Sequence, residues 1–242
     1  MIQVVERACD ILEHLTATPG RCAGSSEIAA ALGISLQTAN NLLRTLYRRG
    51  YLSQDRTRRY RLGAQCVYLG SFADRWNPLR QRLAAPLAKL VEVSGFTAFC
   101  GVLENDRLLC ISLRHRGEAV PPCPTQQWWD ELHSTASGRI LLAALSRPER
   151  KKLLARGTRR KMTAATVVDP ETLETLCCEI SRAGYCEVRG ESRSGVSSLA
   201  IPLRDLSGHV VASMALSAQQ TEWDAVSLEQ KLEWLKNAAV SL

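Results

Sequence analysis

The sequence predicts an α+β protein of two domains, with a winged helix-turn-helix at the N-terminus. Three observations predict this class. The chain has 242 residues, more than a usual single domain contains. Apolar residues recur at helical spacing up to about residue 49, whereas short strand-like segments begin at about residue 96. We therefore expect domains at 1–63 and 94–242, joined by linker helices at 64–93.

The composition indicates a soluble globular protein. Hydrophobic residues make up 45% and charged residues 23%, which excludes collagen-like and disordered classes. The longest segment without a charge, Leu206–Thr221, is interrupted by polar residues, so we expect no membrane span. The first residues have neither a basic leader nor an apolar core. Nine cysteines without a CxxC pair favour reduced thiols, a cytoplasmic location and no metal or other cofactor.

The first fifty residues predict three helices, of which the second and third form a helix-turn-helix. Apolar residues from Val4 to Leu15 lie at helical spacing, and this helix ends before Pro19. Ser25 or Ser26 is placed to cap a short second helix. A third helix runs to about residue 49, with Gly33 in the turn and Ser35 as its cap.

The polar side chains of the third helix predict that it is a recognition helix. Gln37, Asn41, Arg44 and Arg48 form one polar stripe, while Ala39 and the leucines face inward. Gln and Asn can each bind adenine with two hydrogen bonds, and Arg can bind guanine likewise. The alternative is an ordinary three-helix bundle with a polar outer face.

A strand, a polar turn and a second strand follow this helix at residues 51–62. Arg56 and Arg58 lie in the turn, where a wing reaches phosphates or the minor groove. This favours the recognition helix over the plain bundle. The residues expected to contact double-stranded DNA are Ser35, Gln37, Thr38, Asn40, Asn41, Arg44, Arg48, Arg56 and Arg58.

Several short motifs of this region resemble the N-terminal domain of IclR-type bacterial transcriptional regulators. They are Ser26–Ala29, Gly33–Ser35, Thr38–Ala39, Leu42–Leu46 and Gly50–Leu52. The family usually has a basic residue at the position of Leu36 and an arginine at that of Asn41. The operator sequence therefore does not follow from the resemblance.

The linker predicts two helices separated at Asn77–Pro78, with Asn77 as the cap of the second. Pro86 should kink this second helix or mark a late start. The first helix has more apolar surface than a solvated linker needs, so we expect it to pack on another subunit. Its apolar residues are Val67, Tyr68, Leu69, Phe72 and Trp76, with Phe72 and Trp76 on one face.

The C-terminal region predicts a sheet covered by helices rather than a doubly wound fold, because strands and helices alternate only in part. The expected strands are 96–103, 108–114, 185–189, 196–204 and 209–217. The expected helices are about 137–145, 148–156, 171–183 and 224–241. A loop rich in proline and tryptophan, Pro121–Trp129, follows the first hairpin.

This region also resembles the IclR effector domain, whose fold is similar to GAF-type small-molecule sensors. The matching segments are Leu132–Arg139, Gly184–Tyr185, Glu191, Gly195–Val196, Ala200–Leu203 with Asp205, and Ala215–Ser217. The resemblance implies a small-molecule effector, and backbone N–H groups at the helix start that hold its carboxylate. By residue match the effector site contains Leu132, Ala136, Ser137, Val188, Glu191, Val196, Ser198 and Ser217.

Two departures from the family change the expected effector site. Ser198 replaces a usual cysteine and Val188 a usual acid, so one side should be less polar. We expect a small carboxylic acid, sugar-derived or aromatic, with Trp128 or Trp129 close enough to report binding. The alternative is that Ser137 only caps the helix and the pocket binds nothing.

The sequence contains no convincing catalytic site. Gly190–Ser194 lacks the final glycine of a nucleophile elbow, and the four histidines have no ligand-like spacing. His133 and Ser134 are sequence neighbours, which rarely point at one another. The basic segment 147–161 is interpreted as solvated helix and loop, with a second DNA contact as the alternative.

Together these features predict a sequence-specific DNA-binding transcriptional regulator, not an enzyme, controlled by a small-molecule effector. A recognition helix covers one half-site, so a homodimer on a palindromic operator is expected. The resemblance implies such dimers, often paired into homotetramers, and the family contains both repressors and activators. The alternative function is a small-molecule sensor or enzyme with an N-terminal protein-interaction module.

Overall fold

The computed structural model divides into two compact units, Met1–Arg75 and Trp76–Leu242. It describes residues 2–73, 75–116, 118–120, 132–157 and 159–240. The proline- and tryptophan-rich loop, with Trp128 and Trp129, lies outside these residues. The division falls inside the expected linker, so its first helix belongs to the first unit and its second helix to the second.

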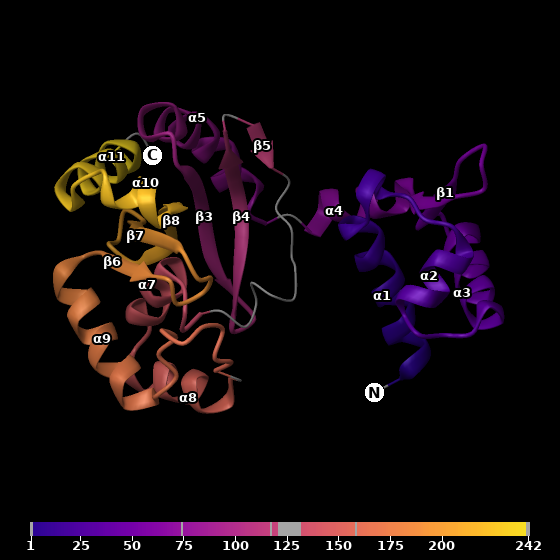
Figure 1. Ribbon diagram of the computed structural model, residues 1–242, viewed down its shortest axis with the longest axis horizontal. Coiled ribbons are helices and arrows are strands. Elements are labelled where there is room, and N and C mark those ends of the chain that lie inside the picture. The colour runs from indigo at the N-terminus through magenta and orange to yellow at the C-terminus, as the bar shows by residue number, and fades with distance from the viewer. Residues whose placement is uncertain (1, 74, 117, 121–131, 158, 241–242) are drawn as a thin grey trace. The chain divides into compact units, whose positions relative to one another are not determined.

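The first unit is a winged helix-turn-helix, as the sequence predicts (Figure 1). Its elements are α1 (Gln3–Ala17), the 3-10 turn η1 (Pro19–Arg21), α2 (Ser25–Ala31), α3 (Leu36–Arg48), β1 (Leu52–Gln54), β2 (Tyr60–Leu62) and α4 (Ala64–Ala73). The two strands pair in an antiparallel hairpin. Ile11, Leu15, Ile28, Ala39 and Leu43 form the buried centre of this unit.

The starts of α2 and α3 use different caps. Ser35 Oγ accepts the backbone N–H of Thr38 at 3.1 Å, which confirms Ser35 as the cap of α3. The predicted serine cap of α2 is wrong, because Ser25 is already the first helical residue. Gly24 precedes the helix instead, and its N–H donates to Glu27 Oε2 at 3.1 Å. Glu27 therefore supplies the reverse half of a capping box: its carboxylate accepts the N–H of the residue before the helix, whereas a serine cap would accept an N–H of the first turn.

The second unit is an antiparallel sheet of six strands in the order β5-β4-β3-β8-β7-β6. The strands are β3 (Thr97–Glu104), β4 (Arg107–His115), β5 (Glu118–Val120), β6 (Cys186–Arg189), β7 (Val196–Arg204) and β8 (Val210–Gln219). The helices are α5 (Asn77–Ser94), α7 (Ala136–Ala144), α8 (Arg147–Arg156), α9 (Pro170–Ala183), α10 (Gln220–Asp224) and α11 (Leu228–Val240). The α+β class predicted for this region is confirmed.

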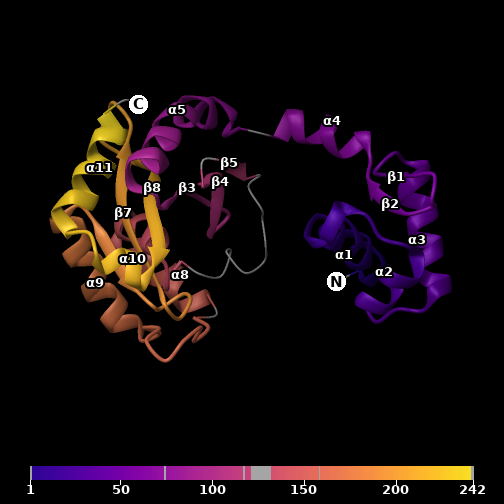
Figure 2. The same cartoon turned by 45° about the horizontal axis from the view of Figure 1, so that its top comes forward.

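Helices cover both faces of this sheet (Figures 1 and 2). Side chains alternate along β7, so that Leu199 joins the cluster under α5 and α11, while Ala200 joins the cluster under α7. Phe99 and Ala215 pack with Ala200 on the α7 face. The small alanines on this face let α7 pack closely on the sheet, and the effector site is expected at the start of this helix.

Trp76 belongs to the second unit, which corrects its expected place beside Phe72. Helix α4 ends at Ala73, and Trp76 is the residue before α5. The indole packs against the core under α5, and its N–H donates to Glu104 Oε2 at 3.1 Å. Asn77 is therefore the first helical residue rather than the cap, and α5 continues through Pro86. No helix among the described residues is long and apolar enough to cross a membrane.

Candidate DNA-binding face and effector site

The polar stripe of α3 lies on the surface of the first unit. Gln37, Asn41, Arg44 and Arg48 are exposed, and Asn40 lies beside them. Within the part of the chain that the structure describes, none of these five side chains has a hydrogen-bond partner. Ala39 and Leu43, on the opposite side of the helix, are fully buried. Ser35 and Thr38 differ from the stripe, because their hydroxyls bond to each other at 2.8 Å in the cap.

The tip of the hairpin is braced by one carboxylate. Asp55 Oδ1 accepts the N–H of Thr57 at 2.8 Å, the hydroxyl of Thr57 at 2.7 Å and the N–H of Arg59 at 3.0 Å. The hydroxyl of Thr57 is the main cause that lowers the pKa of Asp55. Arg56 and Arg58 project from this turn and are exposed. The turn therefore presents two guanidinium groups on a well-defined backbone.

Arg59 fastens the hairpin to α2, a role that the sequence did not reveal. Its guanidinium donates to Glu27 Oε1 at 3.0 Å and Glu27 Oε2 at 2.9 Å. A third bond, to the carbonyl of Cys22, is 3.1 Å long. Glu27 lies 32 residues before Arg59, so no local pattern links them. Of the three arginines at this turn, Arg59 therefore has a structural role, and Arg56 and Arg58 remain available for a ligand.

Helix α7 begins on the sheet with a cap that the sequence did not predict. Thr135 Oγ1 accepts the N–H of Gly138 at 3.1 Å. The alternative that Ser137 caps the helix is therefore wrong. Ser137 is fully buried, and its hydroxyl bonds to Ser213 Oγ at 2.6 Å. The N–H groups of Ala136 and Ser137 lie in the first turn, where a helix supplies no acceptor.

Gly138 allows the preceding loop to approach this turn. A Cβ at Gly138 would lie 2.4 Å from the carbonyl oxygen of Leu132, which is too close for any side chain. Leu132 is buried against the helix. The glycine of the Leu132–Arg139 motif therefore has a packing role, and it brings Leu132 next to the helix start.

Three predicted effector residues form one row across neighbouring strands. Val188 pairs with Ser198, and Ser198 pairs with Ser217, so the three side chains lie on the same face of the sheet. This face is the one that α7 covers, because Val188 and Ala136 belong to the same cluster. Ser198 and Ser217 are half-buried. Val196 lies one step further towards the strand end, opposite Gln219.

Glu191 is not a free charge in the expected effector site, because both its carboxylate oxygens accept hydrogen bonds. Arg139 donates from Nη1 to Glu191 Oε1 at 2.8 Å and from Nη2 to Oε2. The N–H of Val167 also donates to Oε2, at 3.0 Å. Arg139 Nε donates to the carbonyl of His133 at 2.7 Å. Glu191 and Arg139 thus join three segments around the start of α7.

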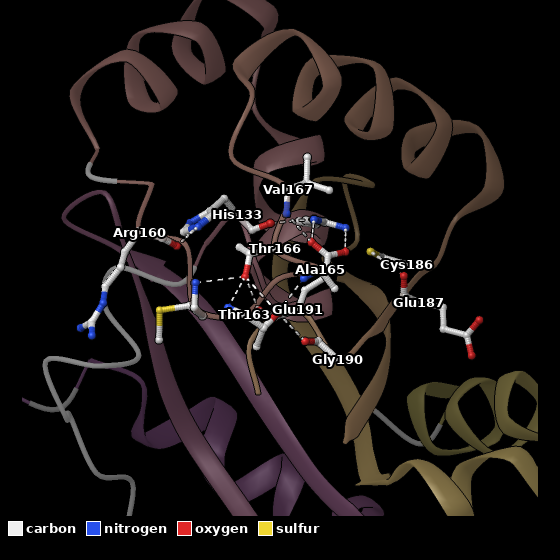
Figure 3. A network of polar contacts seen from close by, with 12 residues as sticks. His133, Arg160, Thr163, Ala165, Thr166, Val167, Cys186, Glu187, Gly190 and Glu191 are labelled. Atoms are coloured by element: carbon white, nitrogen blue, oxygen red, sulfur yellow. Dashed lines mark hydrogen bonds and ion pairs between the residues drawn. The ribbon is translucent and has the colours of Figure 1, made fainter. Parts of the chain in front are cut away.

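The segment before α9 completes this network (Figure 3). Thr163 donates its hydroxyl to the carbonyl of Gly190 at 2.7 Å, and Thr166 donates to that of Glu191 at 2.6 Å. His133 Nε2 bonds to the carbonyl of Arg160 at 2.9 Å. The ring of His133 is therefore part of the network that holds the loops together. Arg139, which the sequence did not single out, is its centre.

The basic segment 147–161 is not wholly solvated as expected, because Arg150 is buried. It is 5% exposed, and its guanidinium donates to Glu174 Oε2 at 2.7 Å and Oε1 at 2.9 Å. The hydrogen bond from Arg150 is the main cause that lowers the pKa of Glu174. Lys151 and Lys152, by contrast, are exposed. Charge alone could not distinguish the buried member of this segment from its neighbours.

Two family models match the chain. The IclR helix-turn-helix domain matches residues 4–56, and the bacterial transcriptional regulator IclR C-terminal domain matches residues 76–242. The second match alone covers more than half of the sequence. The chain belongs to the IclR family. As a member of the IclR family it is a bacterial transcriptional regulator with a helix-turn-helix domain.

Curated relatives support the same membership of the IclR family. The HTH-type transcriptional regulator XynR of Escherichia coli is 28% identical over 255 residues, covering 100% of this chain and 96% of the relative. The glycerol operon regulatory protein of Streptomyces coelicolor is 34% identical over 206 residues, covering 84% and 80%.

Among solved structures, the fold is similar to that of an IclR homologue from Microbacterium hydrocarbonoxydans complexed with 4-hydroxybenzoate. The TM-score is 0.76 and the identity 22%, covering 98% of this chain and 96% of the other.

Proposed function

We propose that the chain binds a palindromic operator in double-stranded DNA, and that a small carboxylic acid controls this binding. The proposed DNA binding rests on the polar stripe of α3. Gln37, Asn41, Arg44 and Arg48 are exposed and have no partner among the described residues, which leaves their donors and acceptors available for base edges. Arg56 and Arg58 would bind phosphates beside the same groove.

The effector half of the proposal rests on the start of α7. Two backbone N–H groups, those of Ala136 and Ser137, have no acceptor inside the helix, and a helix N-terminus favours an anion. The Val188–Ser198–Ser217 row lies on the sheet face beneath this helix. The structural neighbour complexed with 4-hydroxybenzoate binds a carboxylate of the expected size. Ser137 would contribute its N–H rather than its hydroxyl, which is already bonded to Ser213.

The apolar surface of α4 supports a dimer formed through the first unit. Val67 and Phe72 are each 76% exposed, and Tyr68 stacks edge-on against Phe72 with ring centroids 5.1 Å apart. So much exposed apolar area on one short helix is typical of an interaction surface. A homodimer would place two recognition helices on the two half-sites of a palindrome, and two dimers could form a homotetramer. Such a regulator works in the cytoplasm, where bacterial DNA lies.

The proposal is tested with DNA from upstream of the gene itself and of its neighbours. Fluorescence anisotropy of the full chain on these fragments should give one fragment bound at least a hundredfold more tightly than random DNA at the same salt concentration. Small carboxylic acids are then added to that complex, and one class should release the DNA. Equal affinity for every fragment would contradict the operator, and release by no acid would contradict the effector.

A further inference from the structure

The basic segment 147–161 carries the excess positive charge of the second unit. It contains eight basic residues and one acid, whereas the rest of residues 76–242 contains 13 basic and 17 acidic residues. Outside this segment the second unit is therefore negatively charged. So dense a run of cations is expected either to be neutralised within the fold or to face a polyanion.

Four of the eight cations in this segment act within the fold. The carboxylate of Glu174 pairs with Arg150 at 2.7 Å and with Arg147 at 3.3 Å. The pKa of Glu174 is lowered mainly by the hydrogen bond from Arg150, and the charge of Lys151 also contributes. Arg159 donates from Nε to a backbone carbonyl of the segment before α9 at 2.9 Å.

The other four cations have no such partners. All four are exposed, and none makes a hydrogen bond or an ion pair with the residues that the structure describes. Glu149, the one acid of the segment, does not neutralise them, because its carboxylate accepts the N–H of Ser146 at 3.1 Å before the start of α8. We call these four cations the basic patch: Lys152, Arg156, Arg160 and Lys161.

The members of the basic patch follow one another closely. Lys152 and Arg156 are four residues apart on α8, where like charges face each other. Arg160 comes four residues after Arg156 and so lies at most roughly 14 Å away. Its carbonyl bonds to His133, while its guanidinium points away from that network (Figure 3). Crowded like charges destabilise a free surface, and the contact becomes favourable when a polyanion binds.

The composition of the surface favours DNA over a protein as this polyanion. The exposed apolar side chains of the segment are only Pro148 and Ala155. A protein interface depends on large aromatic or apolar anchors and is poor in lysine. The phosphate backbone of DNA, by contrast, is bound by Lys and Arg without any such anchor. Duplex DNA is also the polyanion that a transcriptional regulator meets.

We propose that the basic patch is a second DNA contact, which binds phosphates outside the stretch that the first unit covers and has no sequence preference. It goes beyond the proposed function, because this contact reads no base and binds no effector. Once the first unit has bound, the patch meets neighbouring phosphates at a high effective concentration. Contacts that are weak by themselves then slow the dissociation of the whole protein from DNA.

Anisotropy titrations of the full chain on random duplexes of about 20 and about 80 base pairs test this proposal. The shorter duplex spans roughly the two half-sites of a dimer, and the longer one leaves DNA free beside them. Duplex length changes the number of binding sites and hence the affinity, whereas the slope of log K against log salt counts phosphate contacts.

The patch variant is Lys152→Gln/Arg156→Gln/Arg160→Gln/Lys161→Gln. On the longer duplex its slope should be smaller than that of the wild type by about two to four units. On the shorter duplex the two slopes should differ by less than about one unit.

The matched control is Arg82→Gln/Lys89→Gln/Arg182→Gln/Lys236→Gln. It also removes two arginines and two lysines, all exposed and without a printed bond among the described residues, on α5, α9 and α11. Its slope should match that of the wild type within about one unit on both duplexes. Urea unfolding should give the same midpoint for both variants and the wild type, since every substituted side chain is exposed.

Three results would overturn the basic patch as a second DNA contact. They are a wild-type slope of the patch variant on the longer duplex, equal losses of slope in the patch variant and the control, and an equally large loss on the shorter duplex. Poly-L-glutamate and anionic lipid vesicles test the other partners. If the patch variant lost affinity for either while keeping its slope on the longer duplex, the patch would serve an acidic protein or a membrane. Random DNA contains no operator and no effector is added, so a failure here is separate from a failure of the proposed function.

Discussion

The polar side chains of the two proposed sites differ in whether they are bonded. On α3, Gln37 and Asn41 stand exposed and have no partner among the described residues, whereas around α7 the side chains of Ser137, Arg139 and Glu191 are bonded. DNA is a large ligand that meets a surface, so its contacts need not stabilise the free protein. A small effector enters the interior, where every polar group must be held in place. Substitutions of the polar side chains should therefore change binding without changing stability in the first unit, and should change both in the second unit.

Arg139→Met should lower the unfolding free energy of the second unit strongly and leave that of the first unit unchanged. It removes the partner of the Glu191 carboxylate and of the His133 carbonyl, both held by a side chain that is 3% exposed. Stranding a buried charge costs about 3–5 kcal/mol of unfolding free energy. All five tryptophans lie in residues 76–242, so urea unfolding followed by tryptophan fluorescence reports on this unit alone.

A double variant sharpens that result. Arg139→Met/Glu191→Met removes both charges and should recover part of the lost stability, because no unpaired charge remains. The equivalent loss in the first unit, Gln37→Ala, should leave its stability unchanged because Gln37 is exposed. A loss of less than about 1 kcal/mol in Arg139→Met would show that the network around α7 is not the support that its geometry indicates.

The apolar surface of α4 is the exception in the first unit, because the proposed dimer would couple assembly to DNA binding. Val67→Asp/Phe72→Asp places two charges on side chains that are each 76% exposed. At roughly 25 cal/mol per Å² of apolar area, burial of these side chains in a dimer contributes several kcal/mol. Sedimentation should show smaller species that bind the operator poorly. An unchanged oligomer would place the dimer interface elsewhere.

The wing should affect the salt dependence of DNA binding without any effect on sequence preference. Arg56→Ala and Arg58→Ala each remove one exposed cation, and each should reduce the slope of log K against log salt by about one unit on operator and random DNA alike. Arg182→Ala is the control, because it makes the same charge change on an exposed position of α9. If Arg182→Ala reduced the slope as much, the effect would come from net charge and not from the wing.

The smallest expected effect is a pH dependence of the second unit. The hydrogen bond from Arg150 lowers the pKa of Glu174 below its ordinary value of 4.5. A lowered carboxyl pKa stabilises the fold fully above the ordinary value, and this stabilisation is lost as pH falls through the folded value. The stability difference between wild type and Glu174→Gln should therefore be constant near neutral pH and shrink below pH 4.5. Urea unfolding between pH 7 and pH 3 measures it, and a constant difference would contradict the ion pair.

The parts that sequence could predict are those controlled by local periodicity. The apolar spacing of α3 predicts which side is buried, so the opposite side, with Asn41 and Arg44, follows directly. Ser35 could be assigned as a cap because capping depends on the next three residues. The hairpin and the strands of the second unit follow from short turns between alternating segments.

The parts that sequence could not predict depend on distant partners. Arg59 meets Glu27 across 32 residues, and Arg139 meets Glu191 across 52. Trp76 follows Phe72 at helical spacing, but α4 ends between them, so the shared face does not exist. Thr97 lies beside Ser217 through strand pairing alone, and no motif of its own indicates this neighbour. In each case tertiary contact decides the role of a side chain whose sequence context is ordinary.

Base recognition by α3 is tested most directly by the ratio of operator to random-DNA affinity in variants of its polar stripe. Gln37→Ala and Asn41→Ala should each cost about 1–3 kcal/mol on the operator and little on random DNA, because we propose that these side chains bind base edges and not phosphates. Fluorescence anisotropy on both DNAs, at one salt concentration and with matched thermal stability, gives the ratio. We expect the ratio to fall by about tenfold or more, and equal losses on the two DNAs would contradict base recognition by α3.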